Sequence, residues 1–130
     1  MLALDYGSAR CGCAVSDPSG TIVTPIEAVA NPASRRGLAR IREIAGEREV
    51  ERVLVGLPLS LSGADTEQTR ETRAFAQRLA RSLRDGVPVE LYDERFTTRI
   101  AQRAPGPHSA SEDSRAAAHL LEDWLAARAS

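Results

Sequence analysis

The stretch that decides the fold is Leu2-Ala3-Leu4-Asp5-Tyr6-Gly7-Ser8-Ala9-Arg10-Cys11-Gly12-Cys13-Ala14-Val15-Ser16-Asp17. Two short apolar runs flank a break that contains glycine, which is the pattern of two strands joined by a tight turn. A third run follows the turn signal Asp17-Pro18-Ser19-Gly20, because proline fixes one backbone angle and glycine accepts the other sign. We therefore predict three antiparallel strands, at residues 2–6, 11–16 and 21–29.

Apolar residues recur at helical spacing in three later segments. The first spans residues 34–46, where Ser34 is a candidate N-cap and Gly46 a candidate stop. The second spans residues 66–83 and the third residues 110–127, each with apolar residues along one face. Three helices are therefore predicted.

Two further strands are predicted at residues 52–57 and 87–92, where short apolar runs are bounded by turn-forming residues. The order is then three strands, helix, strand, helix, strand, helix. This order predicts an α/β fold with a five-stranded mixed sheet, three antiparallel strands followed by two parallel ones, flanked by helices. No shift in composition marks a linker, so residues 1–130 are predicted to form a single domain.

Composition and charge exclude several classes of protein. Apolar residues make up 42% and charged residues 27% of the chain, without a low-complexity tract, so a folded protein is expected. No apolar run approaches the roughly 20 residues that span a bilayer, and no signal-like segment is present, so we expect a cytoplasmic location. The formal net charge of −1 argues against binding nucleic acid by bulk charge alone and leaves a local basic patch open.

The two cysteines, Cys11 and Cys13, project to the same side of one predicted strand. The two histidines, His108 and His119, are remote from them and lack zinc-ligand spacing. Neither a disulfide nor a zinc site is expected, and both cysteines are predicted to be small core side chains.

Three carboxylates carry the functional interpretation. Asp5 lies in an otherwise apolar strand, where burial of an unpaired carboxylate would be costly. Glu94 follows the fifth strand, and Asp113 lies in the first turn of the last helix, in phase with its apolar face. Each has an ordinary alternative, respectively a turn cap, an ion pair with the next residue, and a complement to the helix dipole.

The carboxyl ends of parallel strands meet at one edge of an open sheet, and carboxylates that meet there repel one another unless a cation neutralises them. Hard oxygen ligands select Mg²⁺ or Mn²⁺. Two such ions about 4 Å apart can activate a water and stabilise the leaving oxygen in phosphodiester hydrolysis. The hypothesis is a metal-dependent nuclease whose catalytic residues and metal ligands are Asp5, Glu94 and Asp113, with Asp5 bridging both ions.

Four motifs follow one another in the order typical of one family. They are residues 2–17, Val55-Gly56-Leu57-Pro58-Leu59 with Gly63, Arg73-Ala74-Phe75-Ala76, and Asp93-Glu94-Arg95-Phe96-Thr97-Thr98. This set resembles the YqgF-type family of pre-16S rRNA nucleases, which is also described as Holliday-junction-resolvase-like. The resemblance implies an RNase H-like fold, a role in 5′-end processing of pre-16S rRNA in ribosome biogenesis, and the same three carboxylates as metal ligands. Resolution of a Holliday-type DNA junction is the alternative function.

Basic and hydroxyl side chains supply the predicted contacts to nucleic acid. These contacts are Arg10, Arg95, Thr97, Thr98, Arg99 and Arg103. The three arginines of residues 95–103 recur every four residues and form one stripe if that segment is helical, although a solvated face is the alternative. The two threonines can donate to phosphate, although a helix N-cap explains one of them equally well.

Two other functions stay open. The first is a nucleic-acid-binding module with weak catalysis. The net charge is modest, and the segment 99–112 is shorter and less basic than is usual for the family. The second is an ATP-binding fragment of the actin-like class, which also places Asp-x-Gly on a first strand but uses two duplicated domains. The sequence leaves open RNA against branched DNA as the substrate, Mg²⁺ against Mn²⁺, and a monomer against a homodimer.

Overall fold

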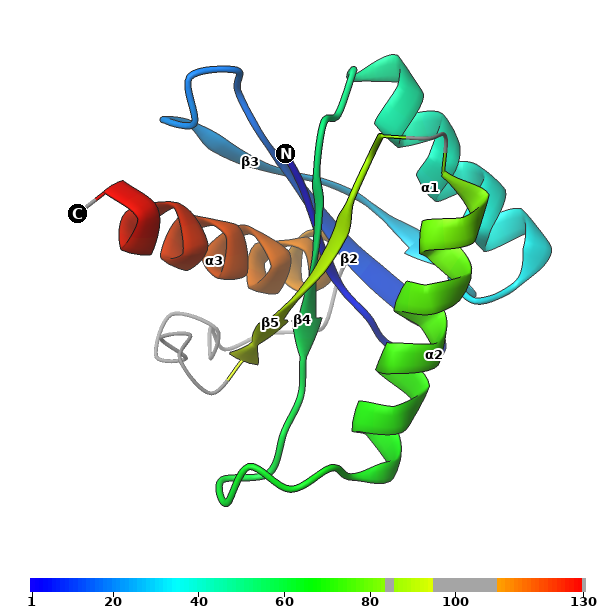
Figure 1. The fold of residues 1–130 in the computed structure, drawn as a ribbon. Helices are drawn as coiled ribbons and strands as arrows, with labels where there is room; N and C mark the ends of the chain where they lie inside the picture. Colours follow the sequence, from blue (N-terminus) through cyan, green and yellow to red (C-terminus); the bar gives the residue numbers. More distant parts are fainter. Residues whose placement is uncertain (84–85, 95–109, 130) are drawn as a thin grey trace.

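A five-stranded mixed sheet with helices on both faces forms the framework of the computed structural model, which describes residues 1–83, 86–94 and 110–129 (Figure 1). The strands are β1 (Leu2–Asp5), β2 (Arg10–Ser16), β3 (Val23–Ala30), β4 (Val53–Leu57) and β5 (Val89–Asp93), and the helices are α1 (Arg35–Glu47), α2 (Glu67–Ser82) and α3 (Ala110–Ala129). The strand order is β3-β2-β1-β4-β5. β2 is antiparallel to both β1 and β3, whereas β4 is parallel to both β1 and β5. The predicted fold class is confirmed.

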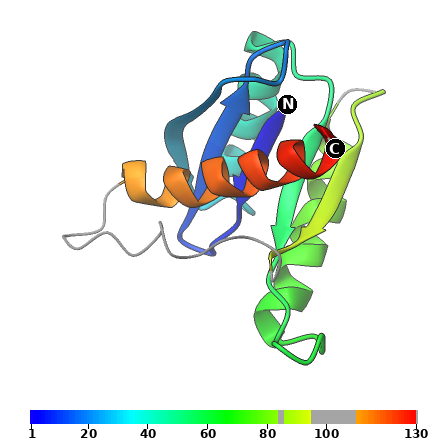
Figure 2. The same ribbon diagram turned by 90° about the vertical axis from the view of Figure 1, so that its left-hand side faces the viewer.

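The two faces of the sheet are covered by different helices (Figure 2). Alternate residues of a strand point to opposite faces, so Leu4 packs with Ile41 of α1 and Phe75 of α2 in one buried cluster. Ala3 belongs instead to the cluster that contains Trp124 of α3. Full burial of side chains as large as Phe75 contributes about 1.5–3 kcal/mol each. No helix in the described ranges is long and apolar enough to cross a membrane.

Both cysteines are buried, free, and part of the cluster beneath α1 and α2. This confirms the prediction that Cys11 and Cys13 are core side chains. Because the residues that alternate with them face α3, β2 presents Gly12 and Ala14 to that helix. Small residues on this face allow α3 to approach the sheet closely.

β3 begins at Val23, two residues later than predicted. The carboxylate of Asp17 accepts hydrogen bonds from the backbone N–H groups of Thr21 at 2.8 Å and Ile22 at 2.9 Å, which keeps both residues in the turn. The hydrogen bond from Ser19, followed by that from Ile22, lowers the pKa of Asp17. A side-chain hydrogen bond to the backbone thus delays the strand.

Gly46 does not end α1, so that prediction is wrong. The N-cap prediction is confirmed, because Ser34 Oγ accepts a hydrogen bond from Gly37 N at 3.0 Å. At the other end, the helix continues to Glu47, and Glu49 adopts the left-handed conformation with φ of 51°. The chain therefore leaves the helix through a glutamate, although glycine is the usual residue there.

β5 is displaced by two residues at its start and one at its end relative to the predicted strand, and includes Asp93. Pro88 has no N–H to donate, but its carbonyl accepts a hydrogen bond from Val53 N at 2.9 Å. Proline therefore precedes the strand and still contributes one bond to the sheet. The extension brings Glu94 directly after the strand end.

Candidate acidic site at the carboxyl edge of the sheet

Two of the three predicted acidic residues lie at the carboxyl ends of parallel strands. β1, β4 and β5 run in the same direction, so their last residues share one edge of the sheet. Asp5 is the final residue of β1, and Glu94 directly follows β5. Both side chains are partly buried. The strand-end rule therefore selects positions on the same edge.

Asp5 has a glycine beside it on each neighbouring strand. It is paired with Gly12 of β2 in the sheet register. On β4, Gly56 follows Val55, the partner of Leu4, so Gly56 is level with Asp5. Side chains at the same level of adjacent strands point to the same face, and this face is the one covered by α3. The surface on both sides of Asp5 is thus free of strand side chains.

The backbone of Asp113 occupies the space next to Gly12. A Cβ built on Gly12 would overlap the carbonyl oxygen of Asp113 and lie 2.9 Å from the backbone nitrogen of Ser114. Helix α3 can lie this close to β2 only because residue 12 has no side chain. The first turn of α3 is therefore held beside Asp5.

The side chain of Glu94 occupies the corresponding space on the other side. A Cβ built on Gly56 would overlap Glu94 Oε1 and lie 3.0 Å from its Cγ and Cδ. Glu94 therefore folds back from the end of β5 over β4. Asp5 has one acidic residue over the glycine on each side, Asp113 over Gly12 and Glu94 over Gly56.

Arg10 is the cationic neighbour of Asp113. Its Nε lies 3.1 Å from Asp113 Oδ2, with side chains 50% and 29% exposed respectively. The contact is an ion pair without hydrogen-bond alignment, because Oδ2 is buried and has no hydrogen-bond partner among the described residues. A buried carboxylate oxygen without a hydrogen-bond partner can accept a hydrogen bond or bind a cation.

The charges of Asp5 and Asp113 reach Cys11 on β2. The hydrogen bond with Cys13 and burial raise the pKa of the Cys11 thiol well above its usual value, and the negative charges of Asp5 and Asp113 raise it further. Cys11 is therefore a neutral thiol.

The oxygen donors fit a hard divalent cation in their chemistry. Within the parts of the chain that the structure describes, however, no three acidic, histidine or cysteine side chains lie close enough together to hold an ion. Asp113 is paired with Arg10, and Asp5 and Glu94 each take part in other interactions. Binding of an ion would therefore require the three carboxylates to leave these contacts and converge.

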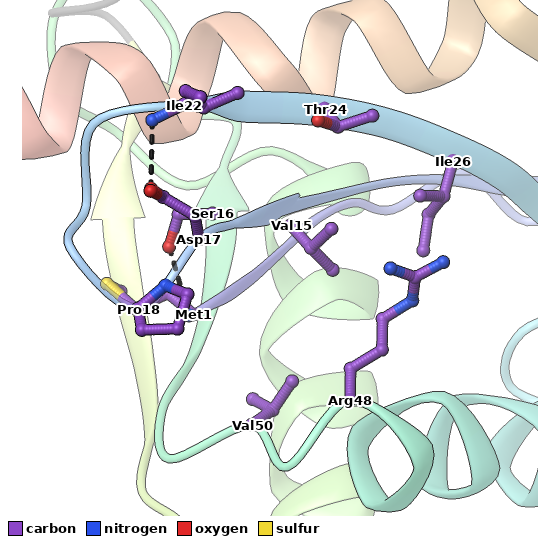
Figure 3. Close-up of a pocket in the computed structure, with 10 residues that line it drawn as sticks. All are labelled: Met1, Val15, Ser16, Asp17, Pro18, Ile22, Thr24, Ile26, Arg48 and Val50. Carbon is purple, nitrogen blue, oxygen red and sulfur yellow. Dashed lines mark hydrogen bonds between the residues drawn. The ribbon is translucent and has the colours of Figure 1, made fainter.

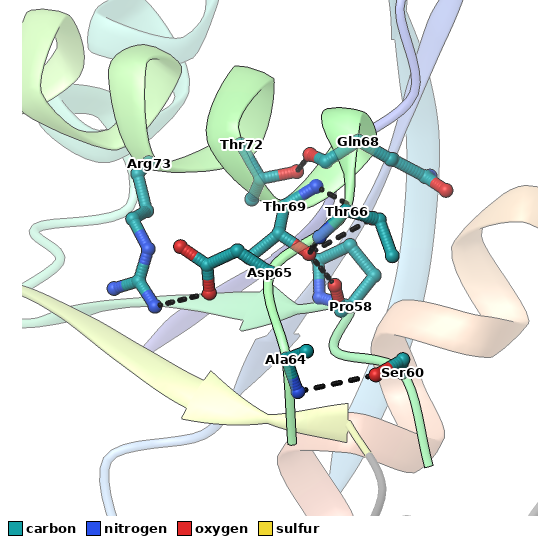
Figure 4. Close-up of polar contacts among 9 residues, drawn as sticks. All are labelled: Pro58, Ser60, Ala64, Asp65, Thr66, Gln68, Thr69, Thr72 and Arg73. Carbon is teal, nitrogen blue, oxygen red and sulfur yellow. Dashed lines mark hydrogen bonds and ion pairs between the residues drawn. The ribbon is translucent and has the colours of Figure 1, made fainter. Parts of the chain in front are cut away.

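The loop between β4 and α2 borders the same edge and is held by its own polar contacts (Figure 4). The hydroxyl of Thr69 donates to the carbonyl of Pro58, and Thr66 Oγ1 accepts from Thr69 N at 3.2 Å as the cap of α2. Arg73 pairs with Asp65 at 3.1 Å across the start of the helix. These contacts give the edge a firm border next to Gly56.

A cleft elsewhere on the molecule does not coincide with these carboxylates (Figure 3). It lies at the opposite end of β2, where Val15, Ile26 and Val50 supply apolar walls and Arg48 a basic one. Asp17 in its lining has its carboxylate bonded to the backbone of Ile22. The acidic edge is the better candidate site, because it brings together three carboxylates, whereas the lining of the cleft contains the single carboxylate of Asp17.

The predicted site residues have different outcomes. The structure brings Asp5, Glu94 and Asp113 to neighbouring positions and puts Arg10 against Asp113, whereas their functional roles stay predictions. The predicted contacts that lie outside the described residues are Arg95, Thr97, Thr98, Arg99 and Arg103. Sequence reasoning missed Gly12 and Ser114. A glycine inside a strand is a signal for close backbone approach, and it could have identified Gly12.

The strand order, the helices on both faces and the acidic edge define an RNase H-like α/β protein. The structure of Thermus thermophilus RuvC shares this fold with a TM-score of 0.58 at 18% identity, over 99% of this chain and 96% of that chain. The structure of T. thermophilus RuvC in complex with Holliday junction substrate gives 0.59 at the same identity and coverage. The chain belongs to the RuvX family, whose model, described as Holliday junction resolvase, matches residues 1–127. The resemblance to the YqgF-type family is thereby confirmed.

Several relatives carry the name "Putative pre-16S rRNA nuclease". The relative from Koribacter versatilis is 41% identical over 79% of this chain and 66% of its own length. The relative from Clavibacter michiganensis is 46% identical over 79% of this chain and 63% of its own. The relative from Mycobacteroides abscessus is 38% identical over 98% of this chain and 81% of its own length. This chain thus spans about two thirds of the length of the first two relatives.

Proposed function

We propose that this chain is a metal-dependent nuclease that cleaves phosphodiester bonds in RNA, in the 5′-end processing of pre-16S rRNA. The names of its relatives and its family support this function. The observation that carries it is the arrangement around Asp5, where two glycines make room for Asp113 and Glu94. The proposal includes a single nuclease domain and a cytoplasmic location, where ribosomal RNA is processed.

In the proposed site, Asp5, Glu94 and Asp113 hold Mg²⁺ or Mn²⁺. Such ions supply an activated water and stabilise the leaving oxygen. Asp5 lies between the other two and would be the ligand shared by the ions held there. Arg10 is half exposed, and its planar fork of donors suits a backbone phosphate at this edge. Further phosphate contacts are assigned to Arg95, Thr97, Thr98, Arg99 and Arg103.

Resolution of four-way DNA junctions is the second candidate function. It is favoured by the description of the family and by the fold shared with a structure of RuvC in complex with Holliday junction substrate. A resolvase must cut two strands and therefore needs two active sites, as in a homodimer. Cleavage of a single RNA strand requires only one site, so a monomer suffices for the first function.

A cleavage panel tests the proposal. Single-stranded RNA, duplex RNA and a four-way DNA junction are each incubated with the protein, with Mn²⁺ and with a chelator in its place. We expect RNA to be cut only with the metal ion. Preferential cutting of the junction would establish the second function. Binding of a nucleic acid without cutting it would establish a binding module. Absence of both Mn²⁺ binding and cleavage would overturn the proposal.

Gly56→Ala is expected to displace Glu94 without unfolding the protein. The new Cβ meets the end of a flexible side chain, which can rotate away, and alanine also reduces the freedom of the unfolded chain. We expect a melting temperature close to that of the wild type and a fall in Mn²⁺-dependent RNA cleavage of about 10-fold or more. Thermal denaturation and initial cleavage rates measure the two effects.

Gly46→Ala in α1 is the matched control for that variant. It is the same replacement, but a Cβ at Gly46 meets no atom within 4 Å. Its cleavage rate should equal that of the wild type, and its stability should rise slightly because alanine favours helix. Equal cleavage by the Gly56→Ala protein would contradict the place assigned to Glu94.

A further inference from the structure

Ser114 is the one fully buried polar side chain in α3 among the described residues. It directly follows Asp113 and lies beside a small apolar cluster of Ala14, Ala117 and Ala118. A polar group in such surroundings is stable only when its hydrogen bonds are satisfied. Its partners therefore show what the hydroxyl does.

The hydroxyl of Ser114 connects two strands. Ser114 Oγ accepts a hydrogen bond from the backbone N–H of Cys13 on β2 at 3.2 Å, and donates to the backbone carbonyl of Ile26 on β3. Cys13 and Ile26 are register partners at a β-bulge, where the pairing of β2 with β3 shifts after Cys11. The side chain thus inserts at an irregularity of the sheet and bonds one backbone group of each strand.

Two contacts then fix the first turn of α3. Gly12 leaves room for the backbone of Asp113, and Ser114 ties the next residue to the bulge. Neither contact involves the Asp113 carboxylate, so that carboxylate is placed by the backbone beneath it and keeps its oxygens for other partners. A bulge next to a functional residue commonly aims a side chain.

We propose that Ser114 is a positioning residue for Asp113, whose carboxylate it holds beside Asp5 by anchoring the start of α3 to the bulge between β2 and β3. The proposal rests on the proposed function, in which Asp113 binds a metal ion. Removal of a group that holds a metal ligand in its orientation typically weakens metal affinity 10- to 100-fold. We expect this range for Ser114.

Calorimetry with Mn²⁺ alone, in the absence of nucleic acid, is the test. Ser114→Ala is expected to bind Mn²⁺ about 10- to 100-fold more weakly than the wild type. The rate of RNA cleavage should recover in part at high Mn²⁺, because the ligands themselves are retained. Hydrogen exchange of the Cys13 amide should become faster, since its partner is lost.

Ser114→Gly is a second variant that tests the same role if Ser114→Ala does not fold. It leaves room for a water that can bond both Cys13 and Ile26, while the tether to α3 is lost. The matched control is Thr72→Val, which removes another fully buried hydroxyl, bonded to Gln68 within α2 at 2.8 Å on the opposite face of the sheet. Its fold should be retained, and its Mn²⁺ affinity should stay that of the wild type.

The outcomes separate the two proposals. Wild-type protein that binds no Mn²⁺ and cuts no nucleic acid refutes the nuclease function. If the wild type binds Mn²⁺ and the folded Ser114 variants bind it equally well, the positioning role is refuted while the nuclease function stands. A loss of affinity in Thr72→Val equal to that in the Ser114 variants would also refute the positioning role, because it would reflect general loosening of the fold.

Discussion

Asp5→Asn is expected to reduce Mn²⁺-dependent RNA cleavage by more than about 100-fold, the upper end of the loss caused by groups that only support a metal ligand. Asn has the shape of Asp but no charge, so it is a weak ligand for a hard cation. Asp5 lies between the positions of Asp113 and Glu94, and its replacement removes the ligand expected to serve both ions.

The fold should tolerate this change. Asp5 is partly buried at the end of β1, and the backbone pairing of that strand with β2 and β4 does not use its side chain. Asn has the size of Asp and keeps one side-chain oxygen that can accept a hydrogen bond. The melting temperature without metal should therefore stay close to that of the wild type.

Asp65→Asn provides the matched control for Asp5→Asn. It is the same replacement at an exposed carboxylate, whose partner is Arg73 at the start of α2. Surface ion pairs of this kind contribute about 0–1 kcal/mol, so both stability and cleavage should be nearly unchanged. Cleavage by Asp5→Asn at the wild-type rate would refute the assignment of Asp5 as a metal ligand.

Strand periodicity and helix caps were sufficient to predict the architecture of the described residues. The differences arise where a side chain competes with the backbone pattern, as with Asp17, which holds Thr21 and Ile22 in a turn. They also arise where the chain leaves a helix through an unexpected residue, as at Glu49 after α1. Both depend on local hydrogen bonds and dihedral angles that apolar periodicity does not encode.

Asp5 and Glu94 were predictable because strand ends converge by topology, and Asp113 because it is in phase with the apolar face of the last helix. The contacts that hold these residues in place were not predictable from the sequence. The contact of Ser114 with Cys13 joins residues 101 positions apart, and it depends on a bulge that exists only once β2 and β3 have paired. The ion pair of Arg10 with Asp113 depends on the same approach of α3 to β2. Such contacts follow from tertiary packing, and no local pattern carries them.

Gly12→Ala is expected to destabilise the protein by about 3 kcal/mol, the upper end of the usual cost of overpacking. The added Cβ would overlap the carbonyl oxygen of Asp113 and crowd the backbone nitrogen of Ser114. Both neighbours are backbone atoms of a helix and cannot rotate away. Relief requires α3 to move from β2, which breaks the hydrogen bonds of the Ser114 hydroxyl and opens the packing of Ala117 against Ala14.

At roughly 3 °C per kcal/mol for a domain of this size, the melting temperature of Gly12→Ala should fall by about 10 °C. Thermal denaturation compared with Gly46→Ala and Gly56→Ala measures this difference, since all three variants add one methyl group to a glycine. Of these three positions, Gly12 is the one where the methyl group meets backbone atoms. Equal melting temperatures for the three variants would mean that α3 does not rest on β2, and with it the placement of Asp113 beside Asp5 would fail.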